Sequence, residues 1–172
     1  ELLGICRDLT VARMTGASVH IAHVSTREGL ELIRRAKHDG VRVSCETCPQ
    51  YFSLTEDAVV HYNTYAKMNP PLRTKDDVEA VLEGLRDGTI DVIATDHAPH
   101  TIDEKEVEYT VAPFGIVGLE TAVGLTLTQL VKPGILTPLQ AIAKLTTNAR
   151  AVVGLPQVKI EAGQETNLTL ID

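Results

Sequence analysis

The sequence has few cysteines, no excess of positive charge and no long apolar run. Its three cysteines, Cys6, Cys45 and Cys48, are too few for the disulfide framework of a small secreted domain, so we expect reduced thiols. Cys45 and Cys48 form a C-x-x-C pattern, but Cys45 lies within a predicted strand and Pro49 follows the second thiol. A redox pair usually sits at a helix N-terminus, so redox or metal use is not favoured.

The charge balance and the hydropathy limit the possible partners. A net charge of −7 argues against nucleic acid or an anionic membrane surface and favours a small substrate or another protein. No apolar run approaches the roughly 18 residues of a membrane span, and no signal-peptide pattern is visible. We therefore expect a cytoplasmic protein that binds neither nucleic acid nor membrane.

The length of 172 residues suits one domain with a sizeable core, but a complete (β/α)8 barrel usually needs about 250. The chain begins within a helical pattern without an initiator Met and stops as a strand pattern is established at 168–172. We therefore expect it to be a piece of a longer protein.

Three strand-then-helix units follow one another along the chain. Helices are predicted at 1–15, 26–38, 75–86, 118–130 and 138–153, and strands at 19–24, 41–46 and 90–95. Ser25 to Glu28 has the form of a capping box, and Thr74 and Thr137 are predicted N-caps. Tandem units of this kind predict a parallel sheet over residues 1–154. Short strands at 158–160 and 168–171 predict a separate small β-domain over 155–172.

Polar residues gather where the predicted strands end, which is where parallel α/β proteins carry their function. Asp96 ends an apolar strand, where a buried carboxylate needs a cation or strong donors, and His97 and His100 flank the same turn. This combination suits a zinc-type metal site with Asp96 as proton acceptor. His23 ends another strand as either a core histidine or a ligand, and His20 is expected on the opposite face of that strand.

Two loop segments carry further candidates. Asn69 precedes Pro70 and Pro71, so it either shapes the loop or offers its amide to a cyclic imide or ureide. Ala112-Pro113-Phe114-Gly115 is either a turn or a rigid stretch that presents backbone groups to a ligand.

Taken together, these segments resemble the bacterial long-chain dihydroorotases of the amidohydrolase superfamily. The segments that carry the resemblance, in order and spacing, are Ile21-Ala22-His23-Val24-Ser25-Thr26, Glu46-Thr47-Cys48-Pro49-Gln50-Tyr51-Phe52, Lys67-Met68-Asn69-Pro70-Pro71-Leu72-Arg73, Ile93-Ala94-Thr95-Asp96-His97-Ala98-Pro99-His100 and Ala112-Pro113-Phe114-Gly115-Ile116-Val117-Gly118-Leu119-Glu120. The resemblance implies an α/β fold, namely strands six to eight of a metal-dependent (β/α)8 hydrolase barrel and the start of a small β-domain.

The resemblance also implies roles for individual residues. His23 matches a metal ligand, and Asp96 matches a zinc ligand that also moves the proton of the attacking water. Asn69, His100 and the Phe114-Gly115 backbone match substrate contacts, and 101–111 matches a mobile loop over the site. The cofactor implied is zinc, two ions per complete site. The family's remaining ligands have no counterpart here, so we expect the piece alone to be inactive.

The implied reaction is the reversible cyclisation of N-carbamoyl-L-aspartate to L-dihydroorotate in pyrimidine synthesis, by a homo-oligomer that associates in some cases with aspartate transcarbamoylase.

Gln50-Tyr51 departs from the His pair of many dihydroorotases and resembles some hydantoinases, so no ligand role is assigned there. Two alternatives stay open. One is a hydantoinase, dihydropyrimidinase or allantoinase, and the other is a non-catalytic dihydroorotase-like subunit that supports aspartate transcarbamoylase.

Overall fold

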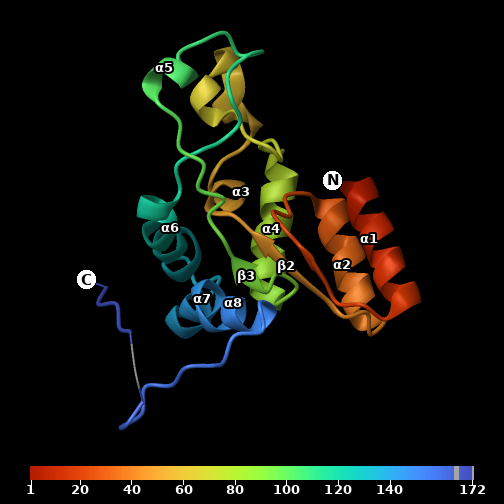
Figure 1. Cartoon of the computed structure of the whole chain (residues 1–172). Coiled ribbons are helices and arrows are strands. Elements are labelled where there is room, and N and C mark those ends of the chain that lie inside the picture. The colour runs from red at the N-terminus through yellow and green to blue at the C-terminus, as the bar shows by residue number, and fades with distance from the viewer. Residues whose placement is uncertain (165–166, 172) are drawn as a thin grey trace.

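Three short parallel strands form the centre of the molecule in the computed structural model, which describes residues 1–164 and 167–171. They are β1 (Val19–Ile21), β2 (Val43–Thr47) and β3 (Val92–Ile93), in the order β1-β2-β3. Ile21 lies opposite Cys45, and Thr47 lies opposite Ile93. Parallel neighbours need crossover connections, and helices supply them, so the predicted parallel sheet is confirmed (Figure 1).

Helices α1 (Leu2–Thr15), α2 (Arg27–His38) and α4 (Lys75–Asp87) cover the sheet. The apolar faces of α2 and α4 meet the strands in the main core, whose largest fully buried side chains include Leu30, Ile33, Leu85 and Ile90. Burial of each such side chain contributes about 1.5–3 kcal/mol to the free energy of unfolding.

The helix boundaries largely follow the predicted caps. Thr74 and Thr137 each form a capping box, and Gly88 ends α4 in the left-handed conformation. The capping box predicted from Ser25 to Glu28 is wrong, because the N-cap of α2 is Thr26. The backbone N–H and hydroxyl of Ser25 donate to the carboxylate of Glu1 instead.

The connection after β2 contains more structure than the sequence indicates. It forms α3 (Pro49–Ser53) and two short 3₁₀ helices, η1 (Glu56–Tyr62) and η2 (Thr64–Ala66). The loop after β3 contains the single turn α5 (Ile102–Lys105). In Figure 1 these two connections lie together at one end of the molecule, beyond the carboxyl ends of the strands.

The last helices differ from the prediction in their continuity. Helix α6 (Leu119–Leu125) continues as a π-helical stretch, η3 (Thr126–Val131). The single helix predicted at 138–153 is wrong, because Thr146, with φ −135° and ψ −84°, divides it into α7 (Pro138–Leu145) and α8 (Thr147–Val152). None of the described helices is both long and apolar enough to cross a membrane.

The described residues beyond 154 form neither helix nor strand, so the strands predicted at 158–160 and 168–171 are not observed. A strand is stable only when a neighbour accepts its hydrogen bonds, and no other described segment pairs with these residues. Residues 165–166 and 172 of the predicted β-domain lie outside the described part of the chain. The division into 1–154 and 155–172 stays a prediction.

Candidate metal and substrate site

His23 and Asp96 face each other across the carboxyl end of the sheet. His23 follows β1 and Asp96 follows β3, with β2 between them. The His23 Nε2 and Asp96 Oδ1 atoms are 3.8 Å apart, and the two side chains are 31% and 37% exposed. Asp96 is thus less buried than the strand pattern predicts. Its carboxylate accepts no hydrogen bond within the described residues, which leaves it open to a cation or a substrate.

Both residues have a backbone conformation that is rare for non-glycine residues. The φ angle is 56° at His23 and 49° at Asp96, in the left-handed region. The two residues lie two and three positions beyond the last residues of β1 and β3. Strain of this kind costs on the order of 1–3 kcal/mol per residue and is concentrated at functional sites.

Glu46 lies at the carboxyl end of β2 and contacts two histidines. Its Oε1 is 3.1 Å from His23 Nδ1, and its Oε2 is 3.1 Å from His20 Nε2. His20 Nδ1 also contacts the hydroxyl of Ser44 at 2.8 Å. The expected separation of His20 from His23 on opposite strand faces is therefore wrong, because β1 ends at Ile21 and the alternation ends with it.

The contact between His23 and Glu46 shifts the pKa values of both groups. The hydrogen bond to Glu46 raises the pKa of His23, against the effect of burial, and the charges of Asp96 and Glu46 add to the increase. Burial alone would raise the pKa of Glu46, but hydrogen bonds from His23 and His20 outweigh it and lower that pKa. Glu46 is therefore a carboxylate at neutral pH.

The pair His23 and Asp96 fits a zinc-type ion in its donor atoms. Zinc in enzymes takes imidazole nitrogen and carboxylate oxygen, and a ligating histidine usually donates its other ring N–H to a carboxylate. Glu46 supplies that carboxylate at Nδ1, so Nε2 is left facing Asp96. Within residues 1–164 and 167–171, no group of three or more His, Cys, Asp or Glu side chains has a geometry that could hold a metal ion.

The two cysteines near this pair are buried free thiols. Cys48 Sγ lies 3.4 Å from His23 Nδ1, but it is fully buried, and burial raises the pKa of its thiol. Burial also raises the pKa of Cys45 to about 12. Both thiols therefore stay protonated at neutral pH, and the absence of redox or metal use stays a prediction.

The two histidines after Asp96 have different environments. His97 Nδ1 accepts hydrogen bonds from the backbone N–H groups of Gly118 and Leu119 at 3.0 and 3.2 Å, so it caps the N-terminal end of α6. His100 Nε2 contacts the carbonyl of Phe114 at 3.0 Å, and its Nδ1 lies 3.4 Å from Glu104. The structure thus places His97 in a capping role and pairs His100 with Phe114.

Phe114 and Gly115 lie against the loop that carries Asn69. The Gly115 N–H donates to the carbonyl of Lys67 at 3.0 Å, two residues before Asn69. Gly115 has φ 142°, and a Cβ atom there would lie 2.5 Å from the carbonyl oxygen of Ala98, so only glycine fits. The Phe114 carbonyl and the Gly115 N–H are both used within the chain. The groups that remain available to a ligand are the Phe114 ring, which is 58% exposed, and the exposed Asn69 side chain.

Sequence reasoning missed Glu46 and the role of the Gln50-Tyr51 segment. Tyr51 is buried, and its hydroxyl donates to the Pro70 carbonyl at 2.7 Å, so it ties α3 to the Asn69 loop. The signal for Glu46 was present, since a carboxylate interrupts an apolar strand pattern one residue before the strand ends.

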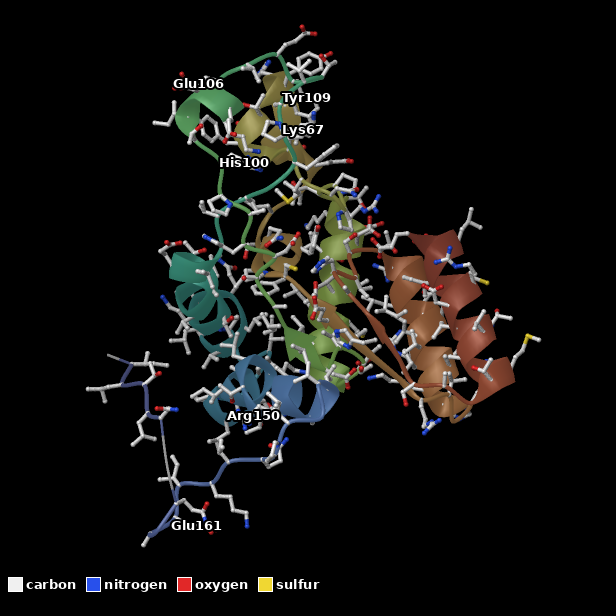
Figure 2. The ribbon with its side chains drawn as sticks, viewed as in Figure 1. Lys67, His100, Glu106, Tyr109, Arg150 and Glu161 are labelled. Carbon is white, nitrogen blue, oxygen red and sulfur yellow. The ribbon has the colours of Figure 1, made fainter. Side chains whose placement is uncertain are left out.

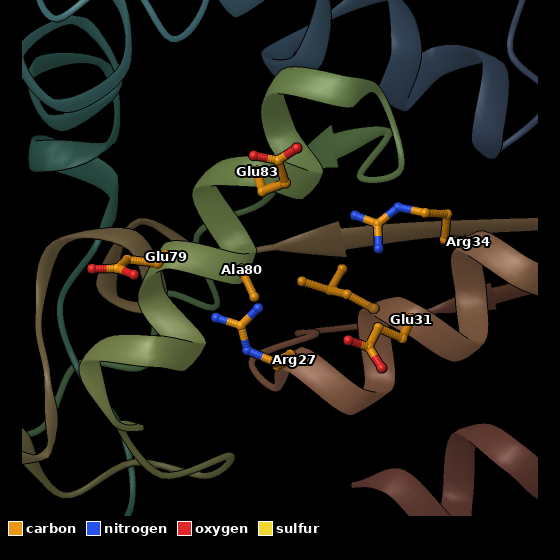
Figure 3. Close-up of a pocket in the computed structure, with 7 residues that line it drawn as sticks. Arg27, Glu31, Arg34, Glu79, Ala80 and Glu83 are labelled. Atoms are coloured by element: carbon orange, nitrogen blue, oxygen red, sulfur yellow. The ribbon is translucent and has the colours of Figure 1, made fainter.

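A groove between α2 and α4 lies outside this site (Figure 3). It is lined by Arg27, Leu30, Glu31, Arg34, Glu79, Ala80 and Glu83. Arg34 already pairs with Asp87, and Arg27 donates to the Asp76 carbonyl. Acidic and basic groups are mixed and partly satisfied, so no ligand class is indicated.

A parallel sheet with helices, and with a histidine and an aspartate beyond its strand ends, defines an α/β protein with a candidate site at the carboxyl edge of the sheet. The sequence matches the profile of the Amidohydrolase family over residues 4–172, and the chain belongs to this family.

Among curated proteins the chain is similar to several dihydroorotases. It is 58% identical over all 172 residues to the dihydroorotase of Pelotomaculum thermopropionicum and 52% identical to that of Acetivibrio thermocellus. The chain spans 40% of the length of each of these relatives.

Among solved structures it is similar to L-hydantoinase (dihydropyrimidinase) from Arthrobacter aurescens. The TM-score is 0.83 at 31% identity, over 89% of this chain and 35% of the other. It is also similar to D-hydantoinase (dihydropyrimidinase) from a Thermus species, with a TM-score of 0.81 at 28% identity, over 88% and 34%.

Proposed function

We propose that this chain forms part of a zinc-dependent dihydroorotase that interconverts N-carbamoyl-L-aspartate and L-dihydroorotate in pyrimidine synthesis. The dihydroorotase relatives, 51–58% identical over 91–100% of the chain, support the substrate. The observation that carries the chemistry is the facing pair of His23 Nε2 and Asp96 Oδ1, with His23 Nδ1 held by Glu46. In this proposal β1, β2 and β3 are strands six, seven and eight of a (β/α)8 barrel.

His23 and Asp96 are the proposed ligands that this chain contributes to a site for two zinc ions. When bound, zinc would polarise the ring carbonyl and lower the pKa of a water molecule. Asp96 is suited to accept and return the proton of that water, because its carboxylate is partly exposed and makes no hydrogen bond to the described residues. Glu46 keeps the His23 ring in one orientation and tautomer.

The two loops beyond the strands supply the proposed substrate contacts. The Asn69 amide offers a donor and an acceptor to the ring edge of dihydroorotate. In this proposal His100 meets the substrate carboxylate after its ring exchanges a present partner, the Phe114 carbonyl or Glu104, and Phe114-Gly115 forms the adjoining surface. We further propose a cytoplasmic homo-oligomer that can associate with aspartate transcarbamoylase, and the three free cysteines agree with a reducing compartment.

A hydantoinase-type activity is the second candidate. The likeness to the hydantoinase structures and the Gln50-Tyr51 segment favour it. The higher identity to dihydroorotases over the whole chain favours dihydroorotase.

The test is an assay of the protein expressed from its complete coding sequence. We expect turnover of L-dihydroorotate and N-carbamoyl-L-aspartate, bound zinc by elemental analysis, and little activity on hydantoin or allantoin. Asp96→Asn, which fits the same space, should lower kcat by about 100-fold or more. Activity on hydantoin alone would contradict the dihydroorotase proposal and favour the hydantoinase-type activity. A zinc-free protein without turnover would identify it as the non-catalytic type of subunit.

A further inference from the structure

Two lysines are buried above the sheet. Lys67, in the connection after β2, is 6% exposed, and Lys105, at the end of α5, is 4% exposed. No carboxylate within the described residues forms an ion pair with either one. A buried ammonium group costs several kcal/mol unless strong acceptors surround it. Both ammonium groups therefore need strong hydrogen-bond acceptors close by.

Backbone carbonyls from the two long connections surround both ammonium groups. Lys67 Nζ donates to the carbonyls of Tyr109 and Ala112, both at 2.6 Å, and contacts that of Thr110 at 3.3 Å. Lys105 Nζ donates to the carbonyls of Pro113 at 2.9 Å and Thr64 at 3.1 Å, and contacts that of Lys67 at 3.4 Å. An ammonium has three donors, so each lysine is saturated.

Aromatic rings complete the surroundings of Lys67. Its Nζ lies 5.2 Å from the centre of the Tyr109 ring and 4.7 Å from that of Phe114. Both distances are within the range of cation–π attraction. Figure 2 shows Lys67, Tyr109 and His100 together in the part of the molecule where the two connections meet.

The contacts are reciprocal between the two connections. The lysine of the first connection is held by carbonyls of the second, and Lys105 of the second is held mainly by carbonyls of the first. The Thr64 hydroxyl donates to the Lys105 carbonyl at 2.6 Å, and the Gly115 N–H donates to the Lys67 carbonyl at 3.0 Å. Hydrogen bonds therefore join the segments 64–69 and 101–115 in both directions, although the resemblance implies a mobile loop at 101–111.

We propose that Lys67 and Lys105 are positioning residues that lock segment 101–115 onto segment 64–69, and so hold His100 and Phe114 beside Asn69. The consequence for substrate binding rests on the proposed dihydroorotase function. The lock itself does not. A locked wall binds the substrate equally well in its ground and transition states, so loosening it raises KM more than it lowers kcat.

The test compares Lys67→Met with Lys132→Met in the protein from its complete coding sequence. Methionine keeps the bulk of the lysine but donates nothing, and Lys132 is an exposed lysine beyond η3. Hydrogen exchange of peptides covering 101–115 should be about tenfold faster in Lys67→Met, because charged hydrogen bonds are lost, and unchanged in Lys132→Met. Unchanged exchange in Lys67→Met overturns the lock.

Kinetics separate the lock from the reaction. With bound zinc unchanged, KM for dihydroorotate should rise about fivefold or more in Lys67→Met, with kcat changed less than KM. Faster hydrogen exchange with an unaltered KM would overturn the claim that the lock holds His100 and Phe114 in place for substrate binding. If the protein does not act on dihydroorotate, the exchange result still decides the lock.

A second variant covers the case in which Lys67→Met does not fold. Tyr109→Leu removes one ring from Lys67 and leaves all its carbonyl partners in place. Exchange in 106–114 should then be about twofold to threefold faster. Unchanged exchange in this variant contradicts the proposed arrangement around Lys67.

Discussion

Single residues at the strand ends carry the proposed chemistry, and the backbone at these residues has an unusual conformation. The backbone is left-handed at His23 and Asp96, and among the other described non-glycine residues only at His61 and Tyr62. A strained backbone conformation at the end of a parallel strand persists only where its surroundings hold it. Around His23 that support comes from Glu46, which also engages His20.

Replacing Glu46 by Gln tests this support. The amide can accept from only one histidine at a time, and its charge is lost, so the His23 ring is no longer fixed with Nε2 toward Asp96. We expect zinc affinity to fall by about 10–100-fold, the usual effect of removing a carboxylate behind a ligating histidine. Competition with a chromophoric chelator measures it, with the exposed Glu28→Gln as control. Equal zinc affinity in both variants would contradict the role of Glu46.

At the scale of elements, an ion pair joins α2 to the end of α4. The carboxylate of Asp87 accepts from Arg34 Nη2 at 2.8 Å and from the Thr89 N–H at 2.8 Å. Burial alone would raise the pKa of Asp87, but the hydrogen bonds from Thr89 and then Arg34 outweigh it and lower the pKa. The carboxylate is therefore bound more favourably in the folded protein than in the unfolded chain.

The lowered pKa of Asp87 predicts that the free energy of unfolding depends on pH. The unfolded Asp87 titrates near pH 3.9, so its stabilising contribution is complete above that pH and is lost as the pH falls through the lower folded pKa. Asp87→Asn should lower the free energy of unfolding by about 1 kcal/mol at pH 7. Urea denaturation should show this difference at pH 7 and a smaller one near pH 2. The exposed Glu31→Gln is the control, and a deficit that is the same at both pH values would exclude the carboxylate as its source.

The order of the elements followed from the sequence, but several boundaries did not. The apolar spacing and the hydroxyl and glycine caps act over a few residues, so α1, α2 and α4 were predicted to within about one residue. The three strands are shorter than predicted, since regular pairing covers only Val19–Ile21, Val43–Thr47 and Val92–Ile93. The break at Thr146 and the π-helical η3 depend on packing and left no pattern in the sequence.

At the scale of the whole molecule, the sheet has two outer edges. No strand of the described residues pairs with the free side of β1 or of β3. Unpaired strand edges expose backbone donors and acceptors and favour association with another strand. The placement of these strands within a closed barrel, as proposed above, would satisfy those groups.

The number of ligands gives a prediction for the chain by itself. His23 and Asp96 are the two candidate ligands that the described residues bring together, whereas catalytic zinc usually takes three protein ligands. We expect the 172-residue chain alone to bind zinc weakly and to show no turnover of dihydroorotate. Isothermal titration with zinc would measure the affinity, and an assay with dihydroorotate would measure turnover. Tight stoichiometric zinc together with turnover would contradict the two-ligand site.

The sequence by itself determined the strand-then-helix order, the caps, and the position of His23 and Asp96 at strand ends, because these depend on local spacing and local hydrogen bonds. It also placed Asn69, His100, Phe114 and Gly115 in the two long connections. Only the tertiary structure decided that Glu46 joins His20 to His23, that His97 caps α6, and that Lys67 and Lys105 lock the connections together. Most of those contacts join residues 21 to 45 positions apart, so they depend on which strands and loops become neighbours in the fold.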